Sequence, residues 1–267
     1  MIEFTHVLFT RFNVPSGGKE VKIRLKDDWL EKRFRLFETF CLPSIEQQSN
    51  KNFLWLIYFD QETPALYKDK VLEYCARCPQ IRPVWVEEWN TQTVKSGFID
   101  NVPENTKSIL TTRLDNDDGL HRDFIDTLQH SVSDYGYYNF PKGVVYRFGD
   151  AYSHSHMSNA FLSLLEEYEG FDGVWKLPHP EVIKKYKVKQ LSLNDAWLQV
   201  IHDNNVSNKI RGRLLSSDTW TEGYPYLSSE LVNENGFLKV AVIGNVKFLV
   251  TSLRDSLFSI IRSAVKR

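Results

Sequence analysis

Cysteine is scarce in this sequence, which has three cysteines among 267 residues: Cys41, Cys75 and Cys78. So small and odd a number does not build a disulfide framework, and it is typical of proteins kept in a reducing compartment. Cys75 and Cys78 form one Cys-x-x-Cys pair, without the second pair that would complete a zinc site. We therefore expect a cytoplasmic protein whose cysteines are structural.

Long hydrophobic runs are also lacking. No apolar segment approaches the roughly 18 residues that a membrane-spanning helix needs, and residues 1–6 lack the basic start and apolar core of a signal peptide. The protein is therefore expected to be soluble or peripheral. Residues 246–267 predict an amphipathic helix with basic side chains, which would either contact the inner face of an anionic membrane or dock on its own domain.

An excess of positive charge is absent as well. The 33 Lys and Arg residues are balanced by 34 Asp and Glu residues, so the formal net charge is -1. This balance gives no electrostatic reason to expect nucleic acid as a partner. Hydrophobic residues make up 42% of the chain, which predicts a folded protein with a sizeable core.

Apolar strands alternate with helical segments in the first half of the chain. Strands are expected at residues 4–12, 53–60, 81–86 and 108–114, and helices at 29–48, with a kink or break at Pro43, and at 63–77. This alternation predicts an α/β fold with a central, mostly parallel sheet flanked by helices.

The second half of the chain has a mixed pattern. Helices are expected at residues 121–132, 159–167 and 180–187, a hairpin from 137–140 and 143–148, and a late strand at 197–202. No internal repeat and no low-complexity segment interrupts this order.

The strand at 108–114 runs directly into three clustered carboxylates, Asp115, Asp117 and Asp118. Charges of one sign are costly to bury unpaired, so a cation or solvent must meet them. Asp115 and Asp117 are two residues apart and would project to the same side of an extended backbone. The alternative is an Asp- and Asn-rich turn that caps the following helix.

A strand that ends in Asp-x-Asp resembles the motif with which nucleotide-sugar glycosyltransferases of the GT-A type hold a divalent metal against a diphosphate. The resemblance implies a Mn²⁺ or Mg²⁺ cofactor bound by Asp115, Asp117 and Asp118, with His202 as a further ligand. Such cations often take only one or two carboxylates from the protein. For His202, an ordinary imidazole bonded to the backbone is the alternative.

The same resemblance implies a nucleotide-sugar donor site at the carboxyl ends of the strands, where ligands of open α/β sheets bind. Arginine forks at Arg11 and Arg113 would match a diphosphate, although ion pairs with aspartates explain them equally well. Asp60 would accept a hydrogen bond from the nucleoside, or else favour the N-terminus of the next helix. The full set of donor-site candidates is Thr10, Arg11, Phe12, Asp60, Lys95, Arg113, Asp115 and Asn116.

An inverting sugar transfer needs a general base that takes the proton of the acceptor hydroxyl. Glu166, at the end of the helix expected at 159–167, is the first candidate, and Asp195, ahead of the late strand, is the second. Neither residue has a specific spacing, and each is equally typical of a solvated carboxylate at the end of a helix or in a loop.

Together, the acidic turn, the strand at 53–60 and the segment Trp197–His202 resemble the rhamnosyltransferase family of GT-A-like bacterial proteins, over roughly residues 4–215. The family implies an activated deoxysugar donor and a cell-surface polysaccharide or lipid-linked glycan as acceptor. We expect a GT-A-like domain at 1–227, with a nucleotide-binding half at 1–120 and an acceptor-binding half at 121–227. A helical appendage would follow at 228–267.

Two other functions stay open at this point. A sugar nucleotidyltransferase would share the fold, but residues 15–19 are a weak version of its glycine-rich phosphate loop. A carbohydrate-binding or scaffold protein on a degenerate transferase fold is the non-enzymatic alternative.

Overall fold

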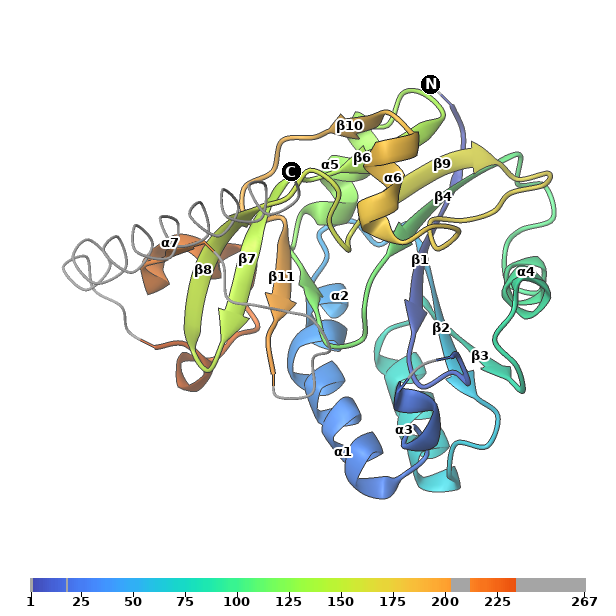
Figure 1. Cartoon of the computed structure of the whole chain (residues 1–267), viewed down its shortest axis with the longest axis horizontal. Coiled ribbons are helices and arrows are strands. Elements are labelled where there is room, and N and C mark those ends of the chain that lie inside the picture. Colours follow the sequence, from blue (N-terminus) through green and yellow to red (C-terminus); the bar gives the residue numbers. More distant parts are fainter. Residues whose placement is uncertain (1, 18, 203–211, 234–267) are drawn as a thin grey trace, which may run out of the picture.

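The structure, a computed structural model, describes residues 2–17, 19–202 and 212–233 (Figure 1). Within these ranges no helix combines the length and the apolar character needed to cross a membrane. The amphipathic helix predicted at 246–267 lies outside the described residues. The proposed division of the chain after residues 120 and 227 stays a prediction.

A seven-stranded sheet forms the centre of the molecule, in the order β10-β6-β9-β4-β1-β2-β3. Its strands are β1 (Thr5–Arg11), β2 (Leu54–Asp60), β3 (Ile81–Val86), β4 (Ser108–Arg113), β6 (Gly136–Asn139), β9 (Ser163–Glu167) and β10 (Val188–Gln190). The strands β3, β2, β1 and β4 run parallel, and β9 runs antiparallel to both β4 and β6. The predicted α/β fold with a mostly parallel sheet is confirmed.

Helical segments cover both faces of this sheet (Figure 1). One face packs against α1 (Asp27–Leu36), a π-helical turn (Phe37–Cys41), α2 (Leu42–Glu46), α3 (Ala65–Arg77) and α5 (Phe124–Ser131), and the other against α4 (Thr91–Ile99). Along β2, Trp55 and Ile57 pack on the first face, and Leu56 and Tyr58 on the second. This alternation explains why the strand is almost continuously apolar. Pro43 lies in the first turn of α2, where its missing N–H is tolerated.

A five-stranded sheet, in the order β12-β8-β7-β11-β5, lies beside the large one. Its strands are β5 (Gly119–Leu120), β7 (Lys142–Arg147), β8 (Asp150–Ser155), β11 (Trp197–Val200) and β12 (Arg213–Leu214). Trp220 from α7 (Ser217–Trp220) and Tyr224 pack into its hydrophobic cluster. The remaining helix, α6 (His179–Lys185), precedes β10.

Two predictions for the second half were wrong. Residues 163–167, expected to end a helix, form β9 between β4 and β6, because a short run that is apolar on all sides fits a strand covered on both faces as well as a helix. The predicted hairpin also fails: β6 belongs to the large sheet, and β7 pairs with β8 instead. Gly149, with φ +87°, supplies the left-handed backbone of that tighter connection.

His6 on β1 is buried, with its Nε2 2.8 Å from Thr112 Oγ1 and its Nδ1 3.1 Å from Gln129 Nε2. Burial lowers the pKa of this imidazole from 6.5 to about 3. The side chain is therefore neutral in the folded protein at acidic pH values that protonate it in the unfolded chain.

We expect His6 to make folding pH-dependent. Its contribution is fully present above the unfolded pKa of 6.5 and is lost as the pH falls toward the folded value of about 3. The loss approaches about 1.4 kcal/mol of unfolding free energy per pH unit within that window. Urea unfolding between pH 7 and pH 4 measures it, and a His6→Gln variant should show a shallower dependence. An identical slope in the variant would contradict the assignment.

Candidate functional site at the acidic turn

The acidic turn, residues 114–118, lies where the two sheets meet. It follows β4, whose parallel neighbour β1 also ends at this edge, with Phe9 in register with Arg113. The chain then continues into β5, which pairs with β11 of the small sheet. The carboxyl ends of parallel strands and the end of β11 are thereby brought together, and this is the edge at which α/β sheets bind ligands.

Asp117 makes the central contacts of this site. Its Oδ2 accepts a hydrogen bond from Arg33 Nη1 at 2.8 Å and lies 2.8 Å from His202 Nε2. Burial opposes ionisation of the Asp117 carboxyl, but the hydrogen bond from His202 and the charge of Arg33 outweigh it and lower its pKa. Asp117 is therefore an ionised carboxylate held between α1 and the segment after β11.

The adjacent Asp118 has a different environment. It is only 3% exposed, and its Oδ1 accepts a hydrogen bond from the Val200 backbone N–H at 2.9 Å. Burial, together with the charges of Asp117 and Asp115, raises the pKa of its carboxyl well above the usual range. Asp118 therefore fastens the turn to β11.

Asp115 and Asn116 are also engaged within the protein. Asp115 Oδ2 accepts from Arg113 Nη2 at 3.1 Å. The Asn116 amide donates to the Phe12 carbonyl at 2.9 Å, and its oxygen accepts from Arg33 at 3.2 Å. Asn116 therefore ties the turn to the segment after β1, although the sequence suggested it as a donor contact.

Asp117 and His202 are the residues that would hold a divalent cation. Their carboxylate and imidazole atoms meet, and a Mn²⁺ or Mg²⁺ ion commonly takes its remaining ligands from substrate phosphates and water. Within the described residues, no group of three or more His, Cys, Asp or Glu side chains is arranged to hold a metal by itself. The donor set therefore fits a cation that arrives with a diphosphate. Asp118 is bonded to the Val200 N–H and Asp115 to Arg113, so their expected roles as ligands stay predictions.

Arg11 and Arg113 both pack against the ring of Trp175. The guanidinium carbons of Arg11 and Arg113 are 3.9 Å and 3.7 Å from the centroid of the Trp175 ring. Trp175 itself donates from Nε1 to the Phe9 carbonyl at 3.2 Å. Arg113 Nε is buried and has no hydrogen-bond partner within the described part of the chain. Such a donor is costly unless a ligand accepts from it, which suits a diphosphate.

Thr10 and Phe12 do not turn toward the acidic turn. Thr10 Oγ1 accepts from Trp55 Nε1 at 2.9 Å, and the Phe12 ring lies 4.6 Å from that of Phe34. Because side chains alternate along a strand, these two point into the core beneath α1, and Arg11 between them points to the opposite face. Both side chains thus pack in the core, and their expected role as donor contacts stays a prediction.

Asp60 and Lys95 have their own contacts within the protein. Asp60 lies at the carboxyl end of β2, and both of its oxygens are engaged, one by Arg24 Nε at 2.7 Å and one by the Glu62 N–H at 2.7 Å. Lys95 extends from α4, with its Nζ 5.5 Å from the Phe171 ring. Asp60 thus serves the local turn, and Lys95 faces the segment before Trp175.

The two expected general bases are not brought to the acidic turn. Glu166 is in register with Ile109 on β4, six residues before Asp115, which places it roughly 20 Å away in extended backbone. The reason is that the segment is an antiparallel strand rather than a helix. Asp195 precedes β11, at the end opposite to His202. It has φ +50° and a pKa raised by burial.

Sequence reasoning missed Arg33, Trp175 and His179. The sequence could have indicated Arg33. It lies three residues after Leu30, on the buried side of α1, and a buried cation needs an acidic partner. Trp175 lies in an irregular segment that carries no periodicity, and His179 follows that segment.

His179 is fixed by a hydrogen bond to the backbone. Its Nδ1 is 2.7 Å from the Ser158 carbonyl, so Nδ1 carries the proton and Nε2 is an acceptor. Burial chiefly, and the charge of Arg113, lower its pKa, while Asp115 raises it.

The solved structures that resemble this chain are distant from it. Residues 1–349 of S. aureus TarS in complex with UDP-GlcNAc align with a TM-score of 0.44 and 8% identity, covering 78% of this chain and 62% of that one. A protein described as a "putative nucleotide-diphospho-sugar transferase" from Desulfovibrio desulfuricans G20 aligns with a TM-score of 0.35 and 14% identity, covering 73% of this chain and 80% of that one. The chain thus spans less than two thirds of the TarS fragment.

Comparison with protein families gives a clear match. No curated protein matches the chain. The family described as "putative rhamnosyl transferase" matches residues 5–214, which include both sheets and the whole acidic turn. The matched range is more than half of the sequence and ends within β12. The chain therefore belongs to the rhamnosyl transferase family.

Proposed function

We propose that this protein is a metal-dependent glycosyltransferase of the GT-A type, which moves a sugar, rhamnose by family membership, from a nucleotide-diphosphate donor to a glycan acceptor. The observation that carries the proposal is the convergence of ionised Asp117 with His202, next to Arg11 and Arg113, at the carboxyl ends of the strands. Membership of the rhamnosyl transferase family supports the same chemistry.

Diphosphate binding is assigned to the two arginines. Arg113 offers a planar fork and an unpartnered buried Nε within the described residues, and Trp175 holds the guanidinium groups of Arg113 and Arg11 against its ring. Stacking fixes the orientation of these groups before the ligand arrives, so less side-chain entropy is lost on binding. A divalent cation on Asp117 and His202 would neutralise charge on the departing diphosphate.

His179 is the base that we propose in place of Glu166 and Asp195. Its Nδ1 is fixed by the Ser158 carbonyl, which leaves the Nε2 lone pair available for the proton of an acceptor hydroxyl. His179 begins α6, shortly after Trp175 in the chain, which supports its place near the proposed diphosphate contacts. An inverting transfer would follow from attack by that hydroxyl on the sugar carbon.

One observation favours a non-catalytic alternative. Arg33 shares the Asp117 oxygen with His202, so the carboxylate is already neutralised within the protein. A carbohydrate-binding domain on a degenerate transferase fold would keep such a pair permanently.

The proposed lipid-linked acceptor and membrane contact depend on residues 246–267, outside the described part of the chain.

Neighbouring aspartates should respond differently to the same substitution. Asp117→Asn removes the ionised cation ligand, and we expect it to weaken binding of UDP or dTDP in Mn²⁺ by at least about tenfold. Asp118→Asn preserves the acceptor for Val200 N–H and removes little charge, so binding should stay within about twofold. Isothermal titration with and without Mn²⁺ measures both. Equal affinities for the two variants would favour the non-catalytic alternative.

Replacement of Arg113 by lysine should show the value of the guanidinium fork. Arg113→Lys keeps the charge but loses bidentate geometry and stacking on Trp175, so we expect about tenfold weaker nucleoside-diphosphate binding even without metal. The matched control is Arg122→Lys, whose side chain is half exposed and should leave affinity unchanged. Full affinity in Arg113→Lys would remove this arginine from the proposed site.

The proposed base can be separated from nucleotide binding. We expect His179→Gln to reduce turnover of nucleotide-sugars by at least about a hundredfold, while the affinity for UDP or dTDP stays unchanged. His130→Gln, at an exposed histidine on α5, is the control. A screen of nucleotide-sugars by release of nucleoside diphosphate measures turnover. Normal turnover in His179→Gln, with loss in Asp195→Asn, would return the role to Asp195.

A further inference from the structure

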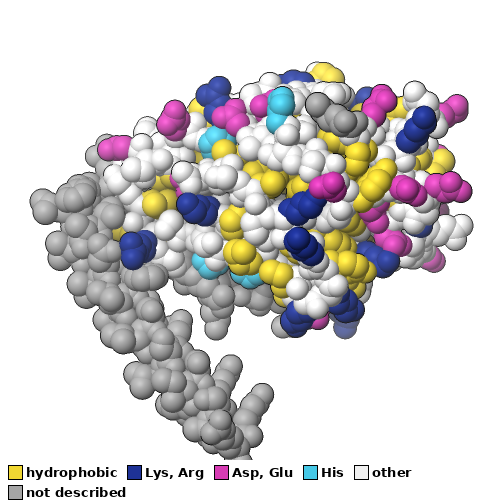
Figure 2. Space-filling model, turned by 90° about the horizontal axis from the view of Figure 1, so that it is seen from above, with side chains coloured by type: hydrophobic (Ala, Val, Ile, Leu, Met, Phe, Trp, Pro, Cys, Tyr) yellow, Lys and Arg dark blue, Asp and Glu magenta, His cyan; other side chains and the backbone are white. Residues whose placement is uncertain are grey.

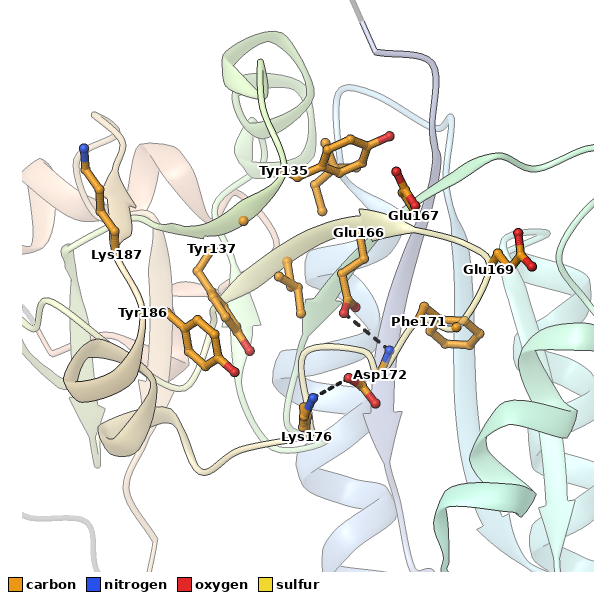
Figure 3. A pocket seen from close by; sticks show the side chains of 14 residues that line it. Tyr135, Tyr137, Glu166, Glu167, Glu169, Phe171, Asp172, Lys176, Tyr186 and Lys187 are labelled. Carbon is orange, nitrogen blue, oxygen red and sulfur yellow. Dashed lines mark hydrogen bonds and ion pairs between the residues drawn. The ribbon is translucent and has the colours of Figure 1, made fainter.

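A cavity of about 530 Å³ lies on the large sheet, away from the acidic turn. Its walls come from β6, β9, residues 169–172 with Lys176, and the segment after α6 (Figure 3). Tyr135, Tyr137, Tyr186 and Phe171 give it aromatic surface, and Glu166, Glu167, Glu169 and Asp172 give it carboxylates. The proposed transfer chemistry uses none of these side chains.

The tyrosines form an open aromatic surface. The rings of Tyr137 and Tyr186 are neighbours, with centroids 5.2 Å apart and planes inclined at 43°. Tyr137 is buried, but Tyr186 is 45% exposed and Tyr135 is 48% exposed, so ring faces remain accessible. Exposed aromatic rings beside a cavity offer large contact area at a small cost in side-chain entropy.

Glu166 provides a fixed acceptor at the floor of the cavity. Its carboxylate accepts from the Gly173 N–H at 2.9 Å and from the Asp172 N–H at 3.3 Å (Figure 3). These bonds hold each oxygen in place and leave further lone pairs for a ligand. Burial, joined by the charges of Glu166, Tyr186 and Asp172, raises the pKa of Tyr137 to about 12, so its hydroxyl stays a donor.

The charge of the cavity selects its ligand. Lys176 forms an ion pair with Asp172, and Lys187 points away from the opening in Figure 3. The lining thus has four carboxylates against two lysines, and this excess of negative charge disfavours phosphates and uronic acids. Figure 2 shows that acidic and basic side chains both occur on the face viewed from above. The excess of negative charge is therefore a property of the cavity lining and not of that whole face.

We propose that this cavity is a second carbohydrate site, which binds a neutral sugar unit of the acceptor glycan away from the point of transfer. Sugar rings present C–H faces that stack on tyrosines and hydroxyls that donate to paired carboxylate oxygens. The inference rests on the proposed function for the identity of the occupant as acceptor glycan. The binding chemistry itself rests on the aromatic and carboxylate lining.

The cavity and the acidic turn share one connecting segment. Phe171, Asp172 and Lys176 line the cavity, and Trp175 within the same segment packs on Arg11 and Arg113. The Val174 N–H donates to Thr111 Oγ1 on β4 at 2.9 Å and anchors this segment to the sheet. A glycan bound in the cavity would therefore contact the segment that positions the proposed diphosphate contacts.

Saturation-transfer NMR on the full chain tests the site with methyl glycosides of rhamnose, glucose, mannose and N-acetylglucosamine. Glucuronate and glucosamine serve as anionic and cationic probes. We expect at least one neutral glycoside to bind, and Tyr186→Ala to weaken it about fivefold through loss of one stacking contact. Glu167→Gln, a surface change, should also weaken it. Phe148→Ala, at an aromatic residue 65% exposed on the β7–β8 connection, should not.

The results separate this site from the transfer site. Neutral binding that survives Asp117→Asn but falls in Tyr186→Ala and Glu167→Gln supports the second site, and UDP affinity should be unchanged in those two variants. Binding of no neutral glycoside, binding of glucosamine alone, or loss of binding in Asp117→Asn would each overturn the proposal. If the unsubstituted protein binds a neutral glycoside but shows no metal-dependent binding of UDP or dTDP, the proposed transferase function would instead be contradicted.

Discussion

The contact of one carboxylate with an arginine and a histidine organises the junction of the two sheets. Asp117 is buried and ionised, and it is held by Arg33 from the long helical segment and by His202 from the end of β11. A buried charge without partners would be prohibitive, so these three segments must stay together. The same geometry presents one carboxylate and one imidazole at the carboxyl edge of a parallel sheet, where a diphosphate and its cation would complete the charge balance.

The strand alternation of β1 decides which side chains belong to the site. Leu8, Thr10 and Phe12 pack beneath the helices, whereas Arg11 emerges on the opposite face and stacks on Trp175. Arg113 of β4 stacks on the same tryptophan. The Trp175 ring thus holds guanidinium groups from two strands. Less side-chain entropy would then be lost when a ligand binds.

The irregular segment that contains Trp175 lies between the acidic turn and the aromatic cavity. On one side it positions the arginines beside the acidic turn, and on the other it lines the aromatic cavity with Phe171 and Asp172. A transferase that extends a polymer benefits from holding the acceptor at a distance from the reacting hydroxyl, because binding energy from remote units can support orientation at the centre of reaction.

Much of the fold was determined by the sequence by itself. The continuous apolar strands at 53–60 and 108–114, the helix at 63–77 and the acidic turn after the second strand all follow from local periodicity and turn chemistry. The sequence also placed Asp117 and His202 in one predicted metal site, and their side chains meet although 85 residues separate them.

Tertiary structure decided the rest. It made residues 163–167 a strand, which carried Glu166 away from the turn, and it turned Asp118 toward Val200. It also brought Trp175 onto two arginines, because packing across sheets joins segments whose proximity no local pattern encodes.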